Sequence, residues 1–202
     1  MRKTDSPLDF LRGEIQNHIS GKRLLHTYAV ENEIKRLGGL YGFDEKEITK
    51  LRISALLHDI TKEIKTEGQL ALCKEYGITV TDNELKSPKL FHSMTGAYLS
   101  RKLFPELVDE TVFNAILYHT SGREDMTLFE KLLYLADYIE ETRTFPDCVT
   151  LRKLFYSTEK FTEEHLNRIL LISFDMTVKN LIDDGYFIHP KTVAARNFLI
   201  NI

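Results

Sequence analysis

An ordered set of histidines and aspartates along the predicted helices most constrains what this chain can fold into. Helical steps of three or four residues place His26 on the same face as Val30 and Ile34, and Asp137 on the face of Leu133. These faces are apolar, so the polar side chains point into a core, where a group without a partner costs several kcal/mol. A metal centre shared by all of them would supply that partner. The set comprises six residues: His26, His58, Asp59, His92, His119 and Asp137.

The same pattern recurs on two further predicted helices, although each member has a simpler interpretation when taken alone. His58 ends the apolar series of Leu51 and Ala55, and His119 follows Ala115 by four residues. A single histidine on such a face is most often a core residue bonded to a carbonyl, and a single aspartate is most often a helix cap or half of an ion pair. The joint occurrence of all six favours a metal centre over coincidence.

The composition is that of an ordinary globular protein, with 43% hydrophobic and 28% charged residues. A chain of 202 residues suits a single domain with a substantial core. The net charge of -3 provides no basic field, so we expect no nucleic-acid partner. A small anionic ligand held by a few local cations remains compatible with this charge.

The sequence also bears on the cellular location. Cys73 and Cys148 match no metal or redox spacing, which favours reduced thiols. The first fifteen residues contain no apolar run like that of a signal peptide. No later segment approaches the roughly 20 apolar residues of a membrane span. We therefore expect a cytoplasmic protein without a membrane partner.

Helical periodicity dominates the chain and strand alternation is nearly absent, so the sequence predicts a single all-α domain over residues 1–202. Its core is expected over about 22–141, with a helical extension over about 149–202. Asp44 and Glu47 form a capping-box pattern, and Gly38-Gly39 is a plausible helix stop. Loops are expected at 121–125 and 142–147. The helices are predicted at about 7–19, 22–38, 44–58, 66–76, 82–86, 92–103, 107–119, 128–141, 149–156 and 161–184.

The donor set predicts two metal ions rather than one. Neighbouring residues such as His58 and Asp59 point about 100° apart on a regular helix, so they converge only awkwardly on a single ion. Six ligands also exceed the four of a tetrahedral zinc site. A carboxylate has two oxygens, so Asp59 can bridge two ions. Imidazole with carboxylate suits Fe, Mn, Zn, Ni or Co, and argues against a pure Mg or Ca site.

A pair of metal ions suits the hydrolysis of a phosphate ester or anhydride, because it activates water and neutralises phosphoryl charge. Side chains that could hold phosphate occur near the predicted ligands. Lys62 lies three residues past Asp59, Arg23 three residues before His26, and Arg143 six residues past Asp137. Taken alone, each cation is more often a solvated surface charge. The segment Thr120-Ser121-Gly122 follows His119, and its hydroxyls and N–H groups could receive phosphate oxygens.

The remaining histidines are expected outside the metal centre. His18 lies near the end of the first predicted helix and His165 in the charged stretch TEEHLNR, so both are predicted at the surface. His189, in the turn DDGYFIHPKT, is predicted to be structural, with a place beside a pocket as the alternative.

In its motifs the chain resembles the HD-domain superfamily of metal-dependent phosphohydrolases, whose signature is His…His-Asp…Asp. The two additional histidines, His92 and His119, resemble the bimetallic branch. The wider context is similar to that of the bacterial YqeK-type proteins, and the likeness extends over nearly the whole chain. The motifs that carry it are RLLHT (23–27), ALLHDITK (55–62), FHSMTGA (91–97), YHTSG (118–122), LYLADYIEETR (133–143) and IHPKTVAARN (188–197).

The resemblance implies a symmetrical diadenosine tetraphosphate hydrolase that yields two nucleoside diphosphates at a dinuclear centre, most often of iron. All six residues of the set would be metal ligands. Asp59 and Lys62 would be the catalytic residues. A homodimer is expected from the resemblance only. The substrate contacts implied are Arg23, Asp59, Lys62, Thr120, Arg143 and, more weakly, Gly185 with the stretch before it.

Two other functions fit the same residues. HD-domain di-iron oxygenases resemble this ligand pattern and use the fold for oxygen chemistry. A nucleotide-sensing module could also keep the metals without physiological turnover. The complete ligand set favours the hydrolase, because an inactive site has no physical reason to keep six buried polar groups.

Overall fold

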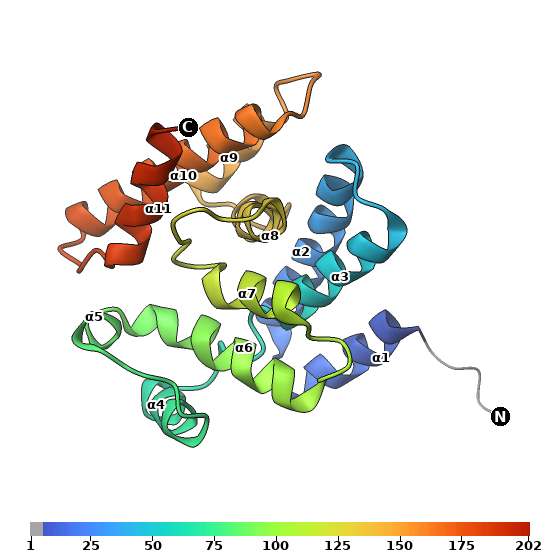
Figure 1. Ribbon diagram of the computed structural model, residues 1–202, viewed down its shortest axis with the longest axis vertical. Helices are drawn as coiled ribbons and strands as arrows, with labels where there is room; N and C mark the ends of the chain where they lie inside the picture. The colour runs from blue at the N-terminus through green and yellow to red at the C-terminus, as the bar shows by residue number, and fades with distance from the viewer. Residues whose placement is uncertain (1–5) are drawn as a thin grey trace.

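A computed structural model describes residues 6–202 of the chain, and within them every regular element is helical (Figure 1). The all-α prediction is confirmed. In chain order the elements are α1 (Pro7–Glu14), η1 (Ile15–Asn17), α2 (Gly21–Leu40), α3 (Glu45–Leu57), α4 (Thr66–Glu75), α5 (Asp82–Leu85), η2 (Pro88–Leu90), α6 (Phe91–Leu103), α7 (Glu110–Tyr118), α8 (Leu128–Ile139), α9 (Pro146–Phe155), α10 (Glu163–Asp183) and α11 (Pro190–Ile200).

Helix α8 occupies the middle of the molecule, where Figure 1 views it nearly along its axis. It packs against α2, α3 and α7 on one side and against α9 and α10 on the other. Its apolar residues Leu132, Leu133, Leu135 and Ala136 are fully buried. Burial on all sides explains why this helix is apolar around most of its circumference. Because α8 carries Asp137, the centre of the core is also the place where a predicted ligand lies.

Short side-chain caps fix where several helices begin. Asp44 accepts the Glu47 N–H at the start of α3, and the Glu47 carboxylate returns a bond to the Asp44 N–H. The predicted capping box is therefore present. Thr127 and Glu130 form the same reciprocal pair at the start of α8. Such caps satisfy N–H groups that a first helical turn leaves without partners.

Several predicted helix boundaries were wrong for identifiable reasons. Helix α2 runs past Gly38-Gly39 to Leu40, because Gly38 lies where α3 packs closely: a Cβ there would be 3.0 Å from Ile48 and from Leu51. The first predicted helix, 7–19, is divided into α1 and a 3₁₀ turn. Helix α9 begins at Pro146, inside the expected 142–147 loop, because proline suits a first helical turn.

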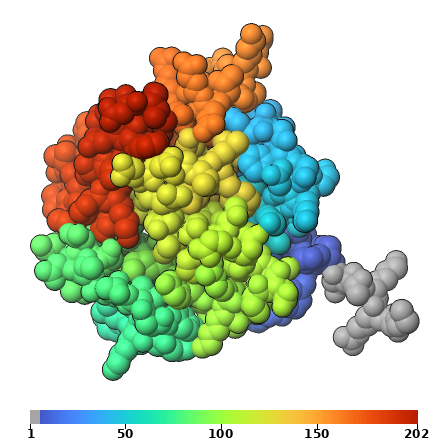
Figure 2. Space-filling view, in the orientation of Figure 1, coloured from blue at the N-terminus to red at the C-terminus, as the bar shows by residue number. Residues whose placement is uncertain are grey.

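The sequence analysis missed helix α11 altogether. Its signal was present, because Pro190 occupies the first turn and the His189 side chain accepts the Lys191 N–H as an N-terminal cap. Helix α11 packs against α10, and Figure 2 shows these C-terminal residues in red beside the green segment that holds α5. The expected 149–202 extension therefore contains three helices rather than two.

In the part of the chain that the structure describes, no helix has both the length and the apolar character that crossing a bilayer requires. The expectation that no signal peptide is present falls partly on residues 1–5, which lie outside the described residues.

Phe174 connects the C-terminal helices to the core, and its loss should be costly. The side chain is fully buried in α10, and its ring centroid lies 4.7 Å from that of Tyr134 in α8. We expect Phe174→Ala to lower the free energy of unfolding by about 3–5 kcal/mol, the usual cost of emptying a phenylalanine site. Chemical denaturation measures this. Phe145→Ala is the matched control, because that ring is 65% exposed, and its change should stay within about 0.5 kcal/mol. Equal losses for the two variants would contradict this role of Phe174.

Candidate metal centre

Three of the predicted ligands share one local arrangement. His58 and His119 directly follow α3 and α7 as their C-terminal caps, and His92 lies in the first turn of α6. In each, the Nδ1–H group donates to the backbone carbonyl three residues earlier, at 2.6 Å for His58 and His92 and 2.7 Å for His119. These bonds fix the ring orientation and turn the Nε2 atom toward the centre, where it could bind a metal.

The fourth histidine is held by a side chain that the sequence analysis missed. His26 of α2 donates from Nδ1 to the Glu140 carboxylate at 2.9 Å. Glu140 is fully buried at the end of α8, where it also accepts from the hydroxyl of Thr142. Its position three residues past Asp137, on the same helical face, was the signal that could have identified it. With Glu140 in place, all four imidazoles present Nε2 to the centre.

The Asp59 carboxylate lies between two pairs of imidazoles. Its Oδ2 atom is 3.5 Å from the Nε2 atom of His58 and 3.8 Å from that of His26. Its Oδ1 atom is 3.3 Å from the Nε2 atom of His92 and 3.7 Å from that of His119. Each oxygen therefore faces a different pair, which is the arrangement expected of a carboxylate that bridges two ions.

Asp137 completes the set, and its carboxylate faces the imidazoles of His26 and His58. Its Oδ1 atom is 3.0 Å from the Nε2 atom of His26 and 3.8 Å from that of His58. The structure thus brings together all six predicted ligands. Three overlapping groups have their donor atoms within 4.8 Å of one another: His26–His58–Asp59, His58–His119–Asp137 and Asp59–His92–His119.

Several of these atoms form no hydrogen bond within the protein. The Nε2 atoms of His26 and His58 and the Oδ1 atom of Asp59 are buried without a hydrogen bond. A buried polar atom left in this way is costly, and three of them directed at one place are consistent with a metal site. The donors are nitrogen and oxygen without thiolate, which fits transition-metal ions of intermediate softness.

The electrostatics favour the protonation states that metals require. Burial by itself raises the pKa of the Asp59 carboxyl, but the neighbouring His58 and Lys62 outweigh it, and the pKa lies well below its usual range. Burial lowers the pKa of His58 to about 4. Burial and the Lys62 charge also hold the pKa of His92 well below its usual range. Near neutral pH the centre therefore offers an ionised Asp59 carboxylate and the neutral imidazoles of His58 and His92, the forms that bind metals.

The three predicted cations lie at the open side of the centre. Arg23 contacts the Oδ2 atom of Asp59 at 2.6 Å, and Arg143 contacts the Oδ1 atom of Asp137 at 2.7 Å. Lys62 lies 3.7 Å from the Oδ1 atom of Asp59. Their side chains are 27%, 28% and 33% exposed, whereas the Asp59 side chain is 2% exposed. A ligand that approaches from solvent would therefore meet positive charge before it reaches the carboxylates.

The loop after α7 contributes one hydroxyl to the centre. Thr120 Oγ1 lies 3.1 Å from the Nε2 atom of His92. Ser121 is buried and donates to the Gly122 carbonyl, and the Gly122 N–H donates to the carbonyl of Tyr118, so these groups are already used within the loop. Gly122 has a φ of +64°, and a Cβ there would be 2.6 Å from the Phe174 ring. The loop therefore packs closely against α10 at Gly122.

Gly185, a predicted substrate contact, lies just after α10. Gly185 adopts a φ of +69° and ends α10, donating its N–H to the Ile182 carbonyl. Its predicted substrate contact stays a prediction.

At the end of α8, Arg152 of α9 donates to the carbonyls of Ile139, Glu140 and Arg143. The C-terminal helices therefore help to position the segment that holds Glu140 and Arg143.

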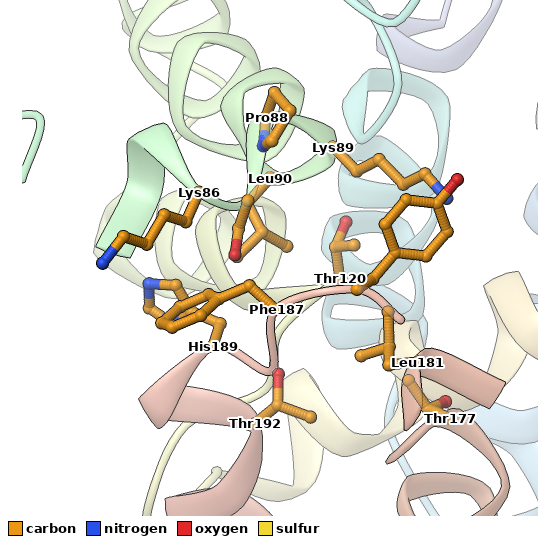
Figure 3. Close-up of a pocket in the computed structure, with 12 residues that line it drawn as sticks. Lys86, Pro88, Lys89, Leu90, Thr120, Thr177, Leu181, Phe187, His189 and Thr192 are labelled. Atoms are coloured by element: carbon orange, nitrogen blue, oxygen red, sulfur yellow. The ribbon is translucent and has the colours of Figure 1, made fainter. Parts of the chain in front are cut away.

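The histidines predicted outside the centre do lie elsewhere. His18 was expected at the surface, but it is half-buried. His165 was expected at the surface, but it is half-buried beside the Phe155 ring and bonds the Phe155 carbonyl at 3.0 Å. His189 is buried, caps α11 and lies 3.2 Å from the Glu84 carboxylate. Its structural role is confirmed, and it also borders a cavity of about 220 Å³ (Figure 3).

Comparison with known proteins agrees with this geometry. The family model described as "HD domain" matches residues 23–142, which include every residue of the centre. The chain belongs to the HD-domain family. This HD-domain protein is also similar in structure to an HD superfamily protein from Clostridium acetobutylicum, described as a predicted hydrolase involved in NAD metabolism. The sequence identity is 37%, the TM-score is 0.83, and the match covers 96% of each chain.

Curated relatives match this HD-domain protein over nearly its whole length. A protein of Bacillus subtilis named symmetrical bis(5'-nucleosyl)-tetraphosphatase is 34% identical, over 93% of this chain and 94% of its own. A protein of the same name from Halalkalibacterium halodurans is 32% identical, over 92% of this chain and 93% of its own.

Glu140 provides a test of how the centre is assembled. We expect Glu140→Gln to weaken metal binding by about 10- to 100-fold, because the amide holds the His26 ring less firmly than the carboxylate does. Elemental analysis after dialysis against a chelator measures this, against an expected wild-type content of about two ions per chain.

The matched control for this variant is Glu141→Gln, because Glu141 is the next residue and is exposed. It should keep the wild-type metal content. Equal metal retention by the two variants would show that Glu140 does not support the centre.

Proposed function

We propose that this HD-domain protein hydrolyses dinucleoside tetraphosphates such as diadenosine tetraphosphate at the middle of the phosphate chain, giving two nucleoside diphosphates. The observation that carries the proposal is the near full-length likeness to relatives named symmetrical bis(5'-nucleosyl)-tetraphosphatase. The buried centre and the cations at its opening supply the physical basis, since phosphoryl transfer depends on positioning and on stabilising charge.

Two transition-metal ions would be held on either side of Asp59. Its Oδ2 atom, His26 and His58 would serve one ion, and its Oδ1 atom, His92 and His119 the other, with Asp137 beside the first group. When bound, the ions activate water for attack on phosphorus and neutralise phosphoryl charge. We propose iron as the metal; Mn, Zn, Ni or Co would also suit imidazole and carboxylate donors.

The cations and Thr120 would hold the phosphate chain over this centre. Lys62 lies 2.9 Å from the Nε2 atom of His92, so its ammonium is beside one of the proposed metal ligands. We propose that it stabilises the negative charge that grows on the phosphoryl oxygens in the transition state. Arg23 and Arg143 approach from the sides of Asp59 and Asp137, and each presents the planar fork that binds phosphate oxygens in pairs.

The remaining expectations are kept as proposals. We propose a division into a core over about 22–141 and a C-terminal extension over about 149–202. We also propose a cytoplasmic location and a homodimer, which gel filtration with light scattering would test.

Lys62 should act on the reaction rather than on the fold. We expect Lys62→Ala to lower kcat/KM for diadenosine tetraphosphate by about 100-fold or more, because an electrostatic contact to the transition state is lost. The metal content and the Tm should hardly change. Lys65→Ala is the matched control, because Lys65 is exposed on the same segment, and it should retain full activity. Loss of metal together with activity would make Lys62 a structural support instead.

The products test the proposed reaction directly. In ¹⁸O-labelled water, the wild-type protein should convert diadenosine tetraphosphate to ADP only, with one labelled oxygen in one of the two ADP molecules, because one P–O bond breaks and water supplies one oxygen. Mass spectrometry measures this. Formation of ATP and AMP would contradict the symmetrical cleavage and leave a phosphohydrolase. A strict requirement for oxygen, without any diphosphate product, would favour the oxygenase.

A further inference from the structure

Three buried polar side chains near the metal centre form a connected set to which the chemistry described above assigns no role. Thr61 lies in the turn between α3 and α4, Gln69 lies in α4, and Thr95 lies in α6. The two threonines are fully buried, and Gln69 is 3% exposed. We refer to these three residues as the threonine–glutamine network.

Gln69 joins two segments through the two ends of its amide group. Its Nε2 atom donates to the Thr61 carbonyl at 2.6 Å and lies 3.3 Å from the Ile64 carbonyl. Its Oε1 atom accepts from the hydroxyl of Thr95. Because carbonyl oxygens only accept hydrogen bonds, the NH₂ end must face Thr61, and the amide has a single favourable orientation. Gln69 thus ties the turn after α3 to α6.

The hydroxyl of Thr61 makes a second connection to α6. It donates to the backbone carbonyl of His92 at 2.9 Å, and it lies 2.9 Å from the hydroxyl of Thr95. His92 is in the first turn of α6 and is one of the six predicted ligands. The turn that follows α3 is therefore attached to the backbone of a ligand that a different helix carries.

These attachments bear on two distances across the metal centre. Asp59 and Lys62 lie in the same turn as Thr61. The Oδ1 atom of Asp59 is 3.3 Å from the Nε2 atom of His92, and the Lys62 ammonium is 2.9 Å from the same atom. Within the turn, the Lys62 N–H donates to the Asp59 carbonyl, which fixes these two residues relative to each other but not relative to α6. The network supplies the link to α6.

Stability alone does not explain why these positions are polar. Replacing hydrogen-bonded buried groups by apolar groups of the same shape is often nearly neutral. The Thr61 carbonyl also accepts the Ile64 N–H at 3.0 Å, and the Thr95 hydroxyl lies 2.9 Å from the Phe91 carbonyl. Both groups would therefore keep a partner without Gln69. A directional network of this kind fixes positions more strictly than apolar packing does.

We propose that the threonine–glutamine network is a positioning device that holds Asp59 and Lys62 at a fixed separation from His92. The network acts through these three residues, in the way that partners behind metal ligands tune affinity and activity. The part of this inference that concerns turnover rests on the function proposed above. The part that concerns metal binding does not.

Two substitutions at Thr61 separate positioning from packing. Thr61→Val keeps nearly the same shape and loses the hydroxyl, whereas Thr61→Ser keeps the hydroxyl and loses a methyl group. We expect Thr61→Val to bind Mn²⁺ about tenfold more weakly and Thr61→Ser to stay close to the wild-type affinity. Competition between the Mn²⁺-loaded protein and EDTA measures this without any substrate. If Thr61 only filled space, the order would be reversed, because serine would leave a cavity.

The matched control is Thr27→Val. Thr27 is also fully buried and also lies beside a predicted ligand, His26, but its hydroxyl has no hydrogen-bond partner within the protein. The same chemical change should therefore leave the Mn²⁺ affinity unchanged.

Gln69→Leu tests the network from its other end. It removes both amide contacts and keeps a side chain of similar bulk, so the protein should fold with a Tm close to that of the wild type. Its Mn²⁺ affinity should fall as in Thr61→Val. The double variant should lose little more than either single variant, because the two residues act as one unit. In turnover of diadenosine tetraphosphate, kcat should fall about tenfold or more with a smaller change in KM.

The outcomes separate this inference from the proposed function. Equal Mn²⁺ affinities of Thr61→Val and Thr27→Val would overturn the positioning role and leave the reaction standing, and so would a weaker affinity in Thr61→Ser than in Thr61→Val. If the wild-type protein cleaves no tetraphosphate while Thr61→Val and Gln69→Leu still bind Mn²⁺ more weakly, the network stands and the proposed reaction fails.

Discussion

A carboxylate buried in a helical core is unstable unless positive charges surround it, and in this protein Arg23 donates to Asp59 while Lys62 lies nearby. The two oxygens of Asp59 face separate pairs of imidazoles, while Arg23 and Lys62 approach from the open side. Five helices, or the residues directly after them, must therefore meet at one point: α2, α3, α6, α7 and α8. The helices can therefore pack in this way only if the charges around Asp59 are also balanced.

Much of the fold and of this centre could be predicted from the sequence, because both depend on helical periodicity. Apolar faces that end in His58, His119 or Asp137 are visible at steps of three and four residues. Glu140 was harder to identify, because a glutamate at a helix end is usually solvated, and its partner His26 is 114 residues away. Helix α11 was missed because Gly185 and Pro190 suggested a turn, although Pro190 in fact begins a helix.

The arrangement of the cavity beside His189 also lay beyond sequence reasoning. Lys89 and Thr120 stand next to predicted ligands, but Tyr186 and Phe187 are brought to them only by the packing of α10 and α11. Periodicity describes one helix at a time and contains no information on which distant loops meet. Gly185 and the stretch before it were associated with nucleoside through family resemblance alone, and that contact stays a prediction.

The bonds from Arg152 couple the reactive centre to the part of the chain that lies outside the HD-domain match. They link α9 to the segment that bears Glu140 and Arg143. Proteins open locally as well as globally, and peripheral elements generally open at lower free energy than the core. Detachment of α9 would release this segment while the five helices around Asp59 stay packed. On warming, the protein should thus pass through a range in which it is still folded but no longer holds Glu140 and Arg143 in place.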